Sequence, residues 1–497
     1  MGIIRRQSIQ NLIFSYGGVA LGYLNQVYLL IAFLSAVQYG LINVILNASV
    51  LFAEVALLGI VPTTLRFAPY FADRSRRSKE FNFLILLYPI VGAGLLACLF
   101  LILKGPLLSF YARESPLFID HYPLILPIFI LMAYSGLVNT ILNSYLKSVL
   151  SVFLKEIFLR LCQTAAILLY AWEVFDFEGL LLAYVGSYVL QLVFLIAYLV
   201  YLGKFRVLPN TRIFRRPIFR LVAKYSFFAF WAQASATIVN RIDLIMLGSN
   251  LAGLEAAAVY SLAMYLSLII FLPSRAVNPI AVPVIAKSWQ KRDLAHILKV
   301  YRESALNNLI LGIILFIGIW INLDSLYLII GKPEFASGKL AFLFLGLAKL
   351  FDIATGVNGG IIYTSKKYQY DLYFNLGLIV LVIATNLLLI PLYQATGAAI
   401  ATAISIFLYN LSRTLFVWRA FDMQPFTKKT IYTLLIAGGA YAASWLLPAV
   451  ENPFFDILLR SVVVGGLYFL CVYVFRISPQ LNGLIRVLQD RIKGFTR

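Results

Sequence analysis

Two long stretches of this chain contain no charged residue, and clusters of basic residues separate its other apolar stretches. The first uncharged stretch runs from Gln7 to Ala53, and the second runs from Leu372 to Ser412. Because one crossing of a bilayer takes about 20 apolar residues, each stretch is long enough for two crossings. The sequence therefore predicts helical hairpins within a membrane.

The composition narrows the class of protein. Hydrophobic residues make up 62% of the chain and charged residues only 12%, a balance that a water-soluble globule does not show. We therefore predict an all-α polytopic membrane protein with about 14 transmembrane helices. The predicted spans are centred near residues 22, 51, 93, 132, 162, 191, 236, 264, 311, 350, 381, 402, 438 and 465.

The distribution of basic residues predicts the orientation. If the N-terminus is cytoplasmic, 34 of the 41 Lys and Arg residues fall in cytoplasmic segments and three fall within spans (Arg241, Lys349 and Arg460). Only four fall on the opposite side: Lys104, Arg113, Lys332 and Lys339. The positive-inside rule then places both termini in the cytoplasm. We attribute the net charge of +20 to this orientation and to anionic lipid headgroups at the cytoplasmic face, and not to nucleic acid.

Weak internal similarity predicts a duplicated core. Residues 25–30 resemble 240–245, and residues 179–183 resemble 397–401, at offsets of 215 and 218 residues. Such an offset covers six spans, an even number, so both halves start on the same side of the membrane. The expected organisation is an N-lobe of six helices (1–203), a basic cytoplasmic connector (204–224), a C-lobe of six helices (225–420), two extra helices (421–477) and a basic amphipathic cytoplasmic tail (478–497).

One predicted hairpin resembles a known family. Residues 385–393 (TNLLLIPLY) followed by 397–405 (GAAIATAIS) resemble the hairpin of helices 11 and 12 in polysaccharide flippases of the multidrug/oligosaccharidyl-lipid/polysaccharide (MOP) superfamily. Pro391 would end one helix at the outer interface, and Gly397 with the small residues after it would let the next helix pack closely. Further matching points are 39–43, 65–67, 240–243, 247–248 and 259–263.

This resemblance, which extends over essentially the whole chain, implies a V-shaped flippase with two pseudo-symmetric lobes around a central cavity. Such proteins lie in the bacterial cytoplasmic membrane and move undecaprenyl-pyrophosphate-linked oligosaccharide repeat units outward for polysaccharide or lipopolysaccharide biosynthesis. The implied partners are the lipid-linked oligosaccharide and polysaccharide assembly proteins.

Several ionisable residues fall within predicted spans, where each charge costs roughly 2.5 to 3.5 kcal/mol. On the helix centred near residue 236, Gln233, Thr237 and Asn240 form one polar stripe, with Arg241 and Asp243 on its shoulders. This pattern predicts a helix that lines a hydrated cavity. The candidate cavity residues are Arg241, Asn240, Asn25, Gln233, Lys349, Arg66 and Arg275.

In the functional interpretation, Arg241 binds a pyrophosphate through charge-assisted hydrogen bonds, aided by Arg66 and Arg275 at the cytoplasmic ends of other spans. The structural alternative is that Arg241 pairs with Asp243 or Asp352. Lys349 and Asp352, three residues apart on one helix, would then pair with each other. Under the same alternative, Arg66 and Arg275 are ordinary positive-inside anchors.

The carboxyl groups of Asp243, Asp352 and Glu54 are candidates for binding a coupling proton or sodium ion. We expect no other cofactor, no metal site and no catalytic residue. The two histidines, His121 and His296, and the three cysteines form no ligand or nucleophile pattern.

Two other functions compete with a flippase. A drug/cation antiporter of the same superfamily would favour an acidic or aromatic cavity over one that contains Arg241. A membrane-embedded sugar polymerase or ligase would usually place catalytic groups on a large outer loop. The longest predicted outer loops here, 104–121 and 322–339, carry few such groups, so we do not expect an enzyme.

Overall fold

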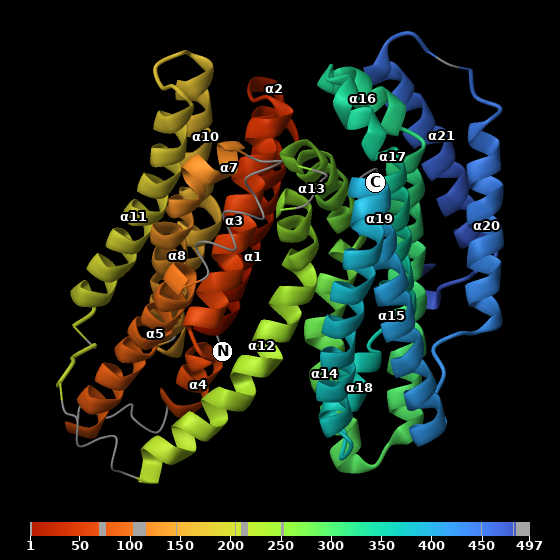
Figure 1. Cartoon of the computed structure of the whole chain (residues 1–497). Helices are drawn as coiled ribbons and strands as arrows, with labels where there is room; N and C mark the ends of the chain where they lie inside the picture. Colours follow the sequence, from red (N-terminus) through yellow and green to blue (C-terminus); the bar gives the residue numbers. More distant parts are fainter. Residues whose placement is uncertain are drawn as a thin grey trace, which may run out of the picture. The chain divides into compact units, whose positions relative to one another are not determined.

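The computed structural model describes residues 2–68, 76–102, 116–145, 147–203, 205–209, 217–249, 253–448, 450–480 and 482–483. Within these ranges every regular element is a helix, and none is a strand (Figure 1). The predicted all-α fold is confirmed, and the centre of each predicted span lies within a described helix. The chain is a multi-pass membrane protein.

The chain divides into two compact units, Met1–Ser261 and Leu262–Arg497, with the division inside one helix. The elements of the first unit are α1 (Gly2–Tyr23), η1 (Leu24–Leu29), α2 (Leu30–Phe33), α3 (Ala36–Ala56), α4 (Ile60–Phe67), α5 (Arg76–Ile102), α7 (Pro116–His121), η3 (Tyr122–Leu124), α8 (Ile125–Ser144), α9 (Ser148–Phe153), η4 (Leu154–Phe158), α10 (Leu159–Ala171), α11 (Phe177–Tyr201), α12 (Pro217–Ser249) and the first part of α13 (Gly253–Ile270). This division follows packing, because α12 packs on α3 and α4. The lobes inferred from duplication stay a prediction.

The second unit begins within α13. Its further elements are α14 (Leu272–Lys291), α15 (Leu294–Trp320), α16 (Leu323–Ile330), η6 (Pro333–Gly338), α17 (Lys339–Ala354), α18 (Asn358–Thr364), α19 (Gln369–Phe421), α20 (Lys428–Ser444) and α21 (Pro453–Val474).

Among the described residues, nine helices are long and apolar enough to cross a membrane, or ten if the bent pair at 333–354 and 358–364 forms one span. The 53-residue helix α19 accounts for two predicted spans, because non-helical backbone at Gln394 breaks it. The predicted spans in α9–α10, α12 and α20 are helical too. They are less apolar or shorter: α20 has 17 residues.

The hairpin within α19 packs as closely as the sequence predicts. A Cβ atom on Gly397 would lie 2.0 Å from the backbone oxygen of Leu389, so any side chain larger than hydrogen would clash there. Ala398, Ala399 and Ala401 follow on the same arm and are fully buried. Small residues therefore let the second arm of α19 return against its neighbours.

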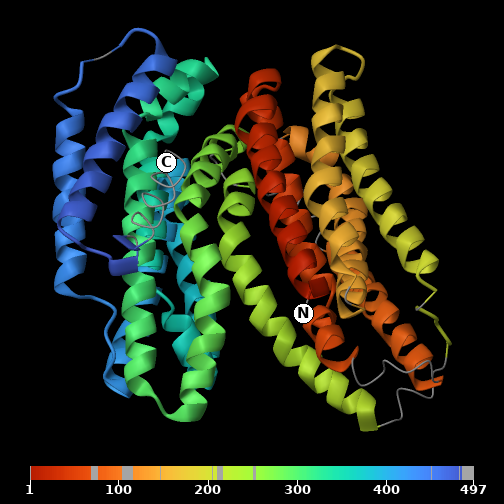
Figure 2. The same cartoon turned by 180° about the vertical axis from the view of Figure 1, so that it is seen from behind.

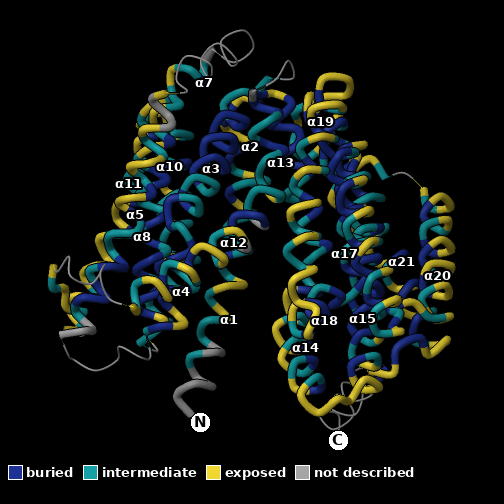
Figure 3. Tube along the Cα trace, turned by 60° about the horizontal axis from the view of Figure 1, so that its bottom comes forward, coloured by how far each residue is buried: buried dark blue, intermediate teal, exposed yellow. Residues whose placement is uncertain are grey.

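Helices α20 and α21 pack on α15 through a buried apolar cluster that includes Ile310, Ile313, Val464 and Tyr468. The Tyr468 hydroxyl also donates a hydrogen bond of 3.0 Å to the Ile310 backbone oxygen. From behind, the two blue helices lie side by side (Figure 2). Much of α20 is exposed (Figure 3), as expected of a helix that faces lipid acyl chains.

The connector (204–224) and the tail (478–497) were both predicted to be cytoplasmic. In the connector, Ile213 and Phe214 lie outside the described residues, whereas Ile218 and Phe219 belong to the first turns of α12. Most of the predicted amphipathic tail, residues 484–497, also lies outside the described part of the chain.

Candidate functional site

The predicted polar stripe lies on α12, and its arginine contacts α3. The half-buried Arg241 guanidinium donates a hydrogen bond to Oδ1 of Asn47. Asn47 is 2% exposed, and its own amide nitrogen donates to the Asn43 backbone oxygen at 2.8 Å. Because that bond uses the N–H side of the amide, Oδ1 is left facing the arginine as an acceptor. Asn47 thus fixes the position of Arg241.

Asp243, on the other shoulder of the stripe, is buried and contacts a different helix. It accepts a hydrogen bond of 2.7 Å from the hydroxyl of Tyr260 on α13, and Tyr260 is itself buried. The two opposite charges on α12 thus each have an uncharged partner on a separate helix: Asn47 for Arg241 and Tyr260 for Asp243. Of the remaining stripe residues, Gln233 is half-buried and Asn240 is exposed.

Asn25 belongs to a second polar group, where the continuous helix of α1, η1 and α2 meets α10. Its amide donates to the Arg160 backbone oxygen at 3.0 Å, and its Oδ1 accepts from the Thr164 hydroxyl at 2.8 Å. Both helices carry a π-helical segment here, η1 around Asn25 and η4 before Arg160. Such segments are rare and are often found at functional sites.

The same contact holds an ion pair that the sequence analysis missed. Arg160 pairs with Glu156 one turn earlier at 3.1 Å and also donates to the backbone oxygen of Gly18. A Cβ atom at Gly18 would lie 2.5 Å from the Glu156 backbone oxygen, so glycine is needed for this approach. Lys155 and Arg160 were counted among the cytoplasmic basic residues, although the four-residue spacing of Glu156 and Arg160 was an available signal for an ion pair on one helix.

The two other predicted site residues of the first unit lie elsewhere on it. Arg66 is exposed, and its guanidinium carbon lies 4.4 Å from the ring centre of Tyr225 on α12, a cation–π contact. Glu54 is half-buried on α3 and interacts electrostatically with Lys155.

In the second unit, Asp352 accepts a hydrogen bond of 2.9 Å from the amide of Asn410. Lys349 is half-buried, and its ammonium group lies 5.8 Å from the ring centre of Phe271. Arg275 is exposed on α14. Lys349 and Asp352 therefore also contact separate uncharged side chains.

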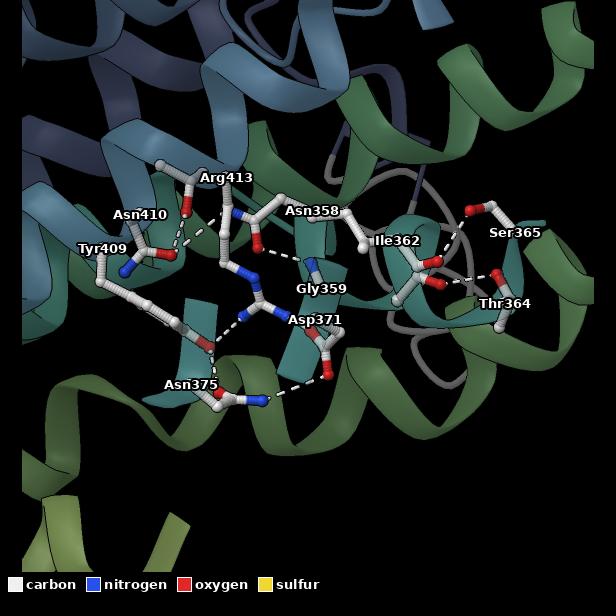
Figure 4. A network of polar contacts seen from close by, with 12 residues as sticks. Asn358, Gly359, Ile362, Thr364, Ser365, Asp371, Asn375, Tyr409, Asn410 and Arg413 are labelled. Atoms are coloured by element: carbon white, nitrogen blue, oxygen red, sulfur yellow. Dashed lines mark hydrogen bonds and ion pairs between the residues drawn. The ribbon is translucent and has the colours of Figure 1, made fainter. Parts of the chain in front are cut away.

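A larger network next to Asp352 was not predicted. Arg413, which is buried, donates to both Asp371 and Tyr409 (Figure 4). The Tyr409 hydroxyl donates to Asn375 at 2.8 Å, and the Asn375 amide donates to Asp371 at 3.2 Å. The sequence held one clue: Asp371 and Arg413 are the two charged residues that bound the uncharged stretch from 372 to 412.

Comparison with solved structures identifies the fold. A structure of the lipid II flippase MurJ in an inward closed conformation aligns with a TM-score of 0.71 at 14% identity, covering 94% of this chain and 98% of that one. An inward-facing multidrug resistance MATE family transporter of the MOP superfamily aligns with a TM-score of 0.63 at 13% identity, covering 81% of this chain and 94% of that one. The chain has the fold of the MOP superfamily. This confirms, at the level of fold, the resemblance found at residues 385–405.

Sequence relatives of this chain are distant. An uncharacterized membrane protein of Methanocaldococcus jannaschii is 23% identical over 473 residues, which are 88% of this chain and 89% of that protein. The capsular polysaccharide biosynthesis protein CapF of Staphylococcus aureus is 23% identical over 192 residues, 38% of this chain and 48% of CapF. No family model matches the chain.

Proposed function

We propose that this chain is a flippase that moves undecaprenyl-pyrophosphate-linked oligosaccharide across the bacterial cytoplasmic membrane. Both solved structures described above are transporters, and one of them is a lipid II flippase. The partial similarity to CapF, named for capsular polysaccharide biosynthesis, favours a polysaccharide repeat unit as cargo. We therefore propose transport for polysaccharide or lipopolysaccharide assembly, alongside the assembly proteins, and no catalytic step.

The observation that carries the proposal is the environment of Arg241. Its hydrogen-bond partner Asn47 is uncharged, so this contact orients the guanidinium without neutralising it. A guanidinium has five N–H donors in a planar fork, and it is suited to bidentate binding of phosphate oxygens. A charge inside a spanning helix costs roughly 2.5 to 3.5 kcal/mol, which favours a functional reason for its presence.

The proposed mechanism is alternating access. The sugar and pyrophosphate would cross beside α12 while the polyprenyl tail stays in lipid along the exposed faces of α20 and α21. Asp243, Asp352 and Glu54 are the proposed positions for a coupling proton or sodium ion, because a carboxyl group that is withdrawn from water takes up a proton more easily. In this mechanism, closing and opening of the lobes would bring Arg241 to the pyrophosphate from one side of the membrane at a time.

The test is outward flipping of undecaprenyl-pyrophosphate-linked oligosaccharide in proteoliposomes, measured for Arg241→Ala and Arg241→Lys. Losing a charge-assisted hydrogen bond costs about 1.5 to 3 kcal/mol, so Arg241→Ala should lower affinity roughly 10 to 150 fold. Arg241→Lys should keep part of the affinity, since a point charge still attracts phosphate. Arg220→Ala, which removes an exposed arginine from the same helix, is the matched control and should leave flipping unchanged.

A drug/cation antiporter is the second candidate, because one of the aligned structures is a multidrug resistance transporter and because Asp243 is a buried carboxyl group. Arg241→Ala and one further variant, Asp243→Asn, separate the two functions. If Arg241→Ala leaves flipping intact and Asp243→Asn abolishes export of cationic drugs, the antiporter should replace the flippase.

A further inference from the structure

A cavity of about 450 Å³ lies against α19 in the second unit, beyond the network around Arg413. Residues from both arms of α19 and from the segment before it form its walls. Those that bear on its chemistry are Lys367, Phe374, Ser412, Leu415, Phe416 and Arg419. The cavity therefore combines two cations, one hydroxyl group and an apolar wall.

The two cations of this cavity are absent from the ion pairs found between described residues, and aromatic rings lie beside one of them, Lys367. The Lys367 ammonium group lies 5.8 Å from the ring centre of Phe416 and 5.6 Å from that of Phe421. The Lys367 backbone N–H donates to the Ser365 hydroxyl at 2.9 Å. Among the ion pairs found between described residues, none includes Lys367 or Arg419. Both side chains are exposed.

The acidic groups near the cavity do not cancel this charge. Asp371 is bound to Arg413 and to Asn375. Asp422 follows the last residue of α19, and its backbone has the left-handed conformation. It is exposed to solvent. The lining itself contains two basic residues and no acidic one, so the cavity favours an anion.

The walls indicate that the anion belongs to a lipid. Phe416 packs against Phe374 and Tyr370, with ring centres 5.6 and 4.6 Å apart. Tyr370, Tyr373 and Trp418 are exposed, and Tyr and Trp are the residues typical of the aromatic belt at a membrane interface. Leu415 of the lining is exposed as well, which offers an apolar surface to an acyl chain.

We propose that this cavity binds the headgroup of an anionic phospholipid in the cytoplasmic leaflet. Lys367 and Arg419 bind the lipid phosphate through charge-assisted hydrogen bonds, the Ser412 hydroxyl donates to it, and an acyl chain lies along Leu415. Basic pockets between transmembrane helices on the cytoplasmic side bind lipid phosphates in this way. The leaflet follows from the positive-inside orientation of this basic cluster.

The direct test is binding of short-chain phosphatidylglycerol to the purified full-length protein in detergent, with phosphatidylcholine as the neutral comparison. The double variant Lys367→Gln/Arg419→Gln should weaken phosphatidylglycerol binding roughly 30 fold. Each cation contributes about 1 kcal/mol to the binding of an anionic lipid, and each 1.4 kcal/mol corresponds to about a tenfold change in affinity. The matched control is Lys428→Gln/Lys429→Gln, which removes two exposed charges at the start of α20. It should change binding by less than about threefold, because those charges act only through screened, long-range attraction.

Three results would overturn the proposal: equal weakening by both double variants, equally tight binding of phosphatidylcholine, or tighter binding of undecaprenyl pyrophosphate than of phosphatidylglycerol. The last result would identify the cavity as an entry point for cargo and not as a phospholipid site. Thermal unfolding of each variant identifies any that fails to fold, and in that case the single variant Arg419→Gln, at an exposed position, provides the comparison. Loss of flipping in Arg241→Ala with normal phosphatidylglycerol binding would show that the two sites are independent.

Discussion

Arg413 forms an ion pair with Asp371 across the two arms of α19 (Figure 4). These residues lie 42 positions apart in the chain, and the break at Gln394 folds the helix back so that they meet. Tyr409 and Asn375 complete the network, so each charge has a second, uncharged partner. The hairpin thus neutralises the two charges that bound its uncharged stretch.

The first prediction is that Arg413→Ala destabilises the fold by about 3 kcal/mol, because it leaves Asp371 partly buried without its cation. Thermal or denaturant unfolding in detergent measures the loss. The double variant Arg413→Leu/Asp371→Leu, which removes both charges, should recover most of it, since neither charge is then left unpaired. If the single and double variants are equally destabilised, the unpaired charge of Asp371 is not the cause of the lost stability.

The second prediction concerns Asn47, which accepts a hydrogen bond from Arg241. Asn47→Asp has nearly the same shape but places a carboxylate beside the guanidinium. A salt bridge would then compete with the pyrophosphate, and affinity for the lipid-linked cargo should fall about as far as in Arg241→Ala, roughly 10 fold or more. Asn47→Ala adds no charge and should have a smaller effect. Equal effects of the two substitutions would mean that the charge of Arg241 does not act on the cargo.

The positions of the spanning helices could be predicted from the sequence, whereas most contacts between side chains could not. The hydropathy and charge of a span are sums over many residues, so an error at one residue changes the predicted position little. The pairing of Asp371 with Arg413 depends on where the hairpin turns, and a shift of two residues in one arm would separate them. Within the π-helical turn around Asn25, the side-chain amide donates to the Arg160 backbone oxygen, and Oδ1 accepts from the Thr164 hydroxyl. Such a turn has no pattern that a single sequence shows.

The third prediction tests this contact between η1 and α10. The Thr164 hydroxyl donates to Asn25 and to the backbone oxygen one turn earlier, whereas the Thr140 hydroxyl donates only within its own helix among the contacts described. Thr164→Val should lower the free energy of unfolding by about 1 to 2 kcal/mol, because a buried amide oxygen loses its donor. Thr140→Val should cost less than half as much. Similar losses at both positions would show that the contact with Asn25 contributes little.

The fourth prediction fixes the orientation on which the proposed lipid site depends. Val174, in the loop between α10 and α11, is 62% exposed, so Val174→Cys can react with a reagent without disturbing the Asp176 side chain that caps α11. The background variant must replace Cys98, Cys162 and Cys471, since Cys98 is exposed.

If the basic clusters lie in the cytoplasm, Val174 lies on the opposite side of the membrane. A membrane-impermeant maleimide added to intact cells should then label Val174→Cys. Lys429→Cys, at the start of α20, should react only after the membrane is opened, because the positive-inside rule places that cluster on the cytoplasmic side. The reverse pattern would put Lys367 and Arg419 in the outer leaflet. The cavity beside α19 would then face a different set of lipids, and the phospholipid proposed for it would have to come from that leaflet.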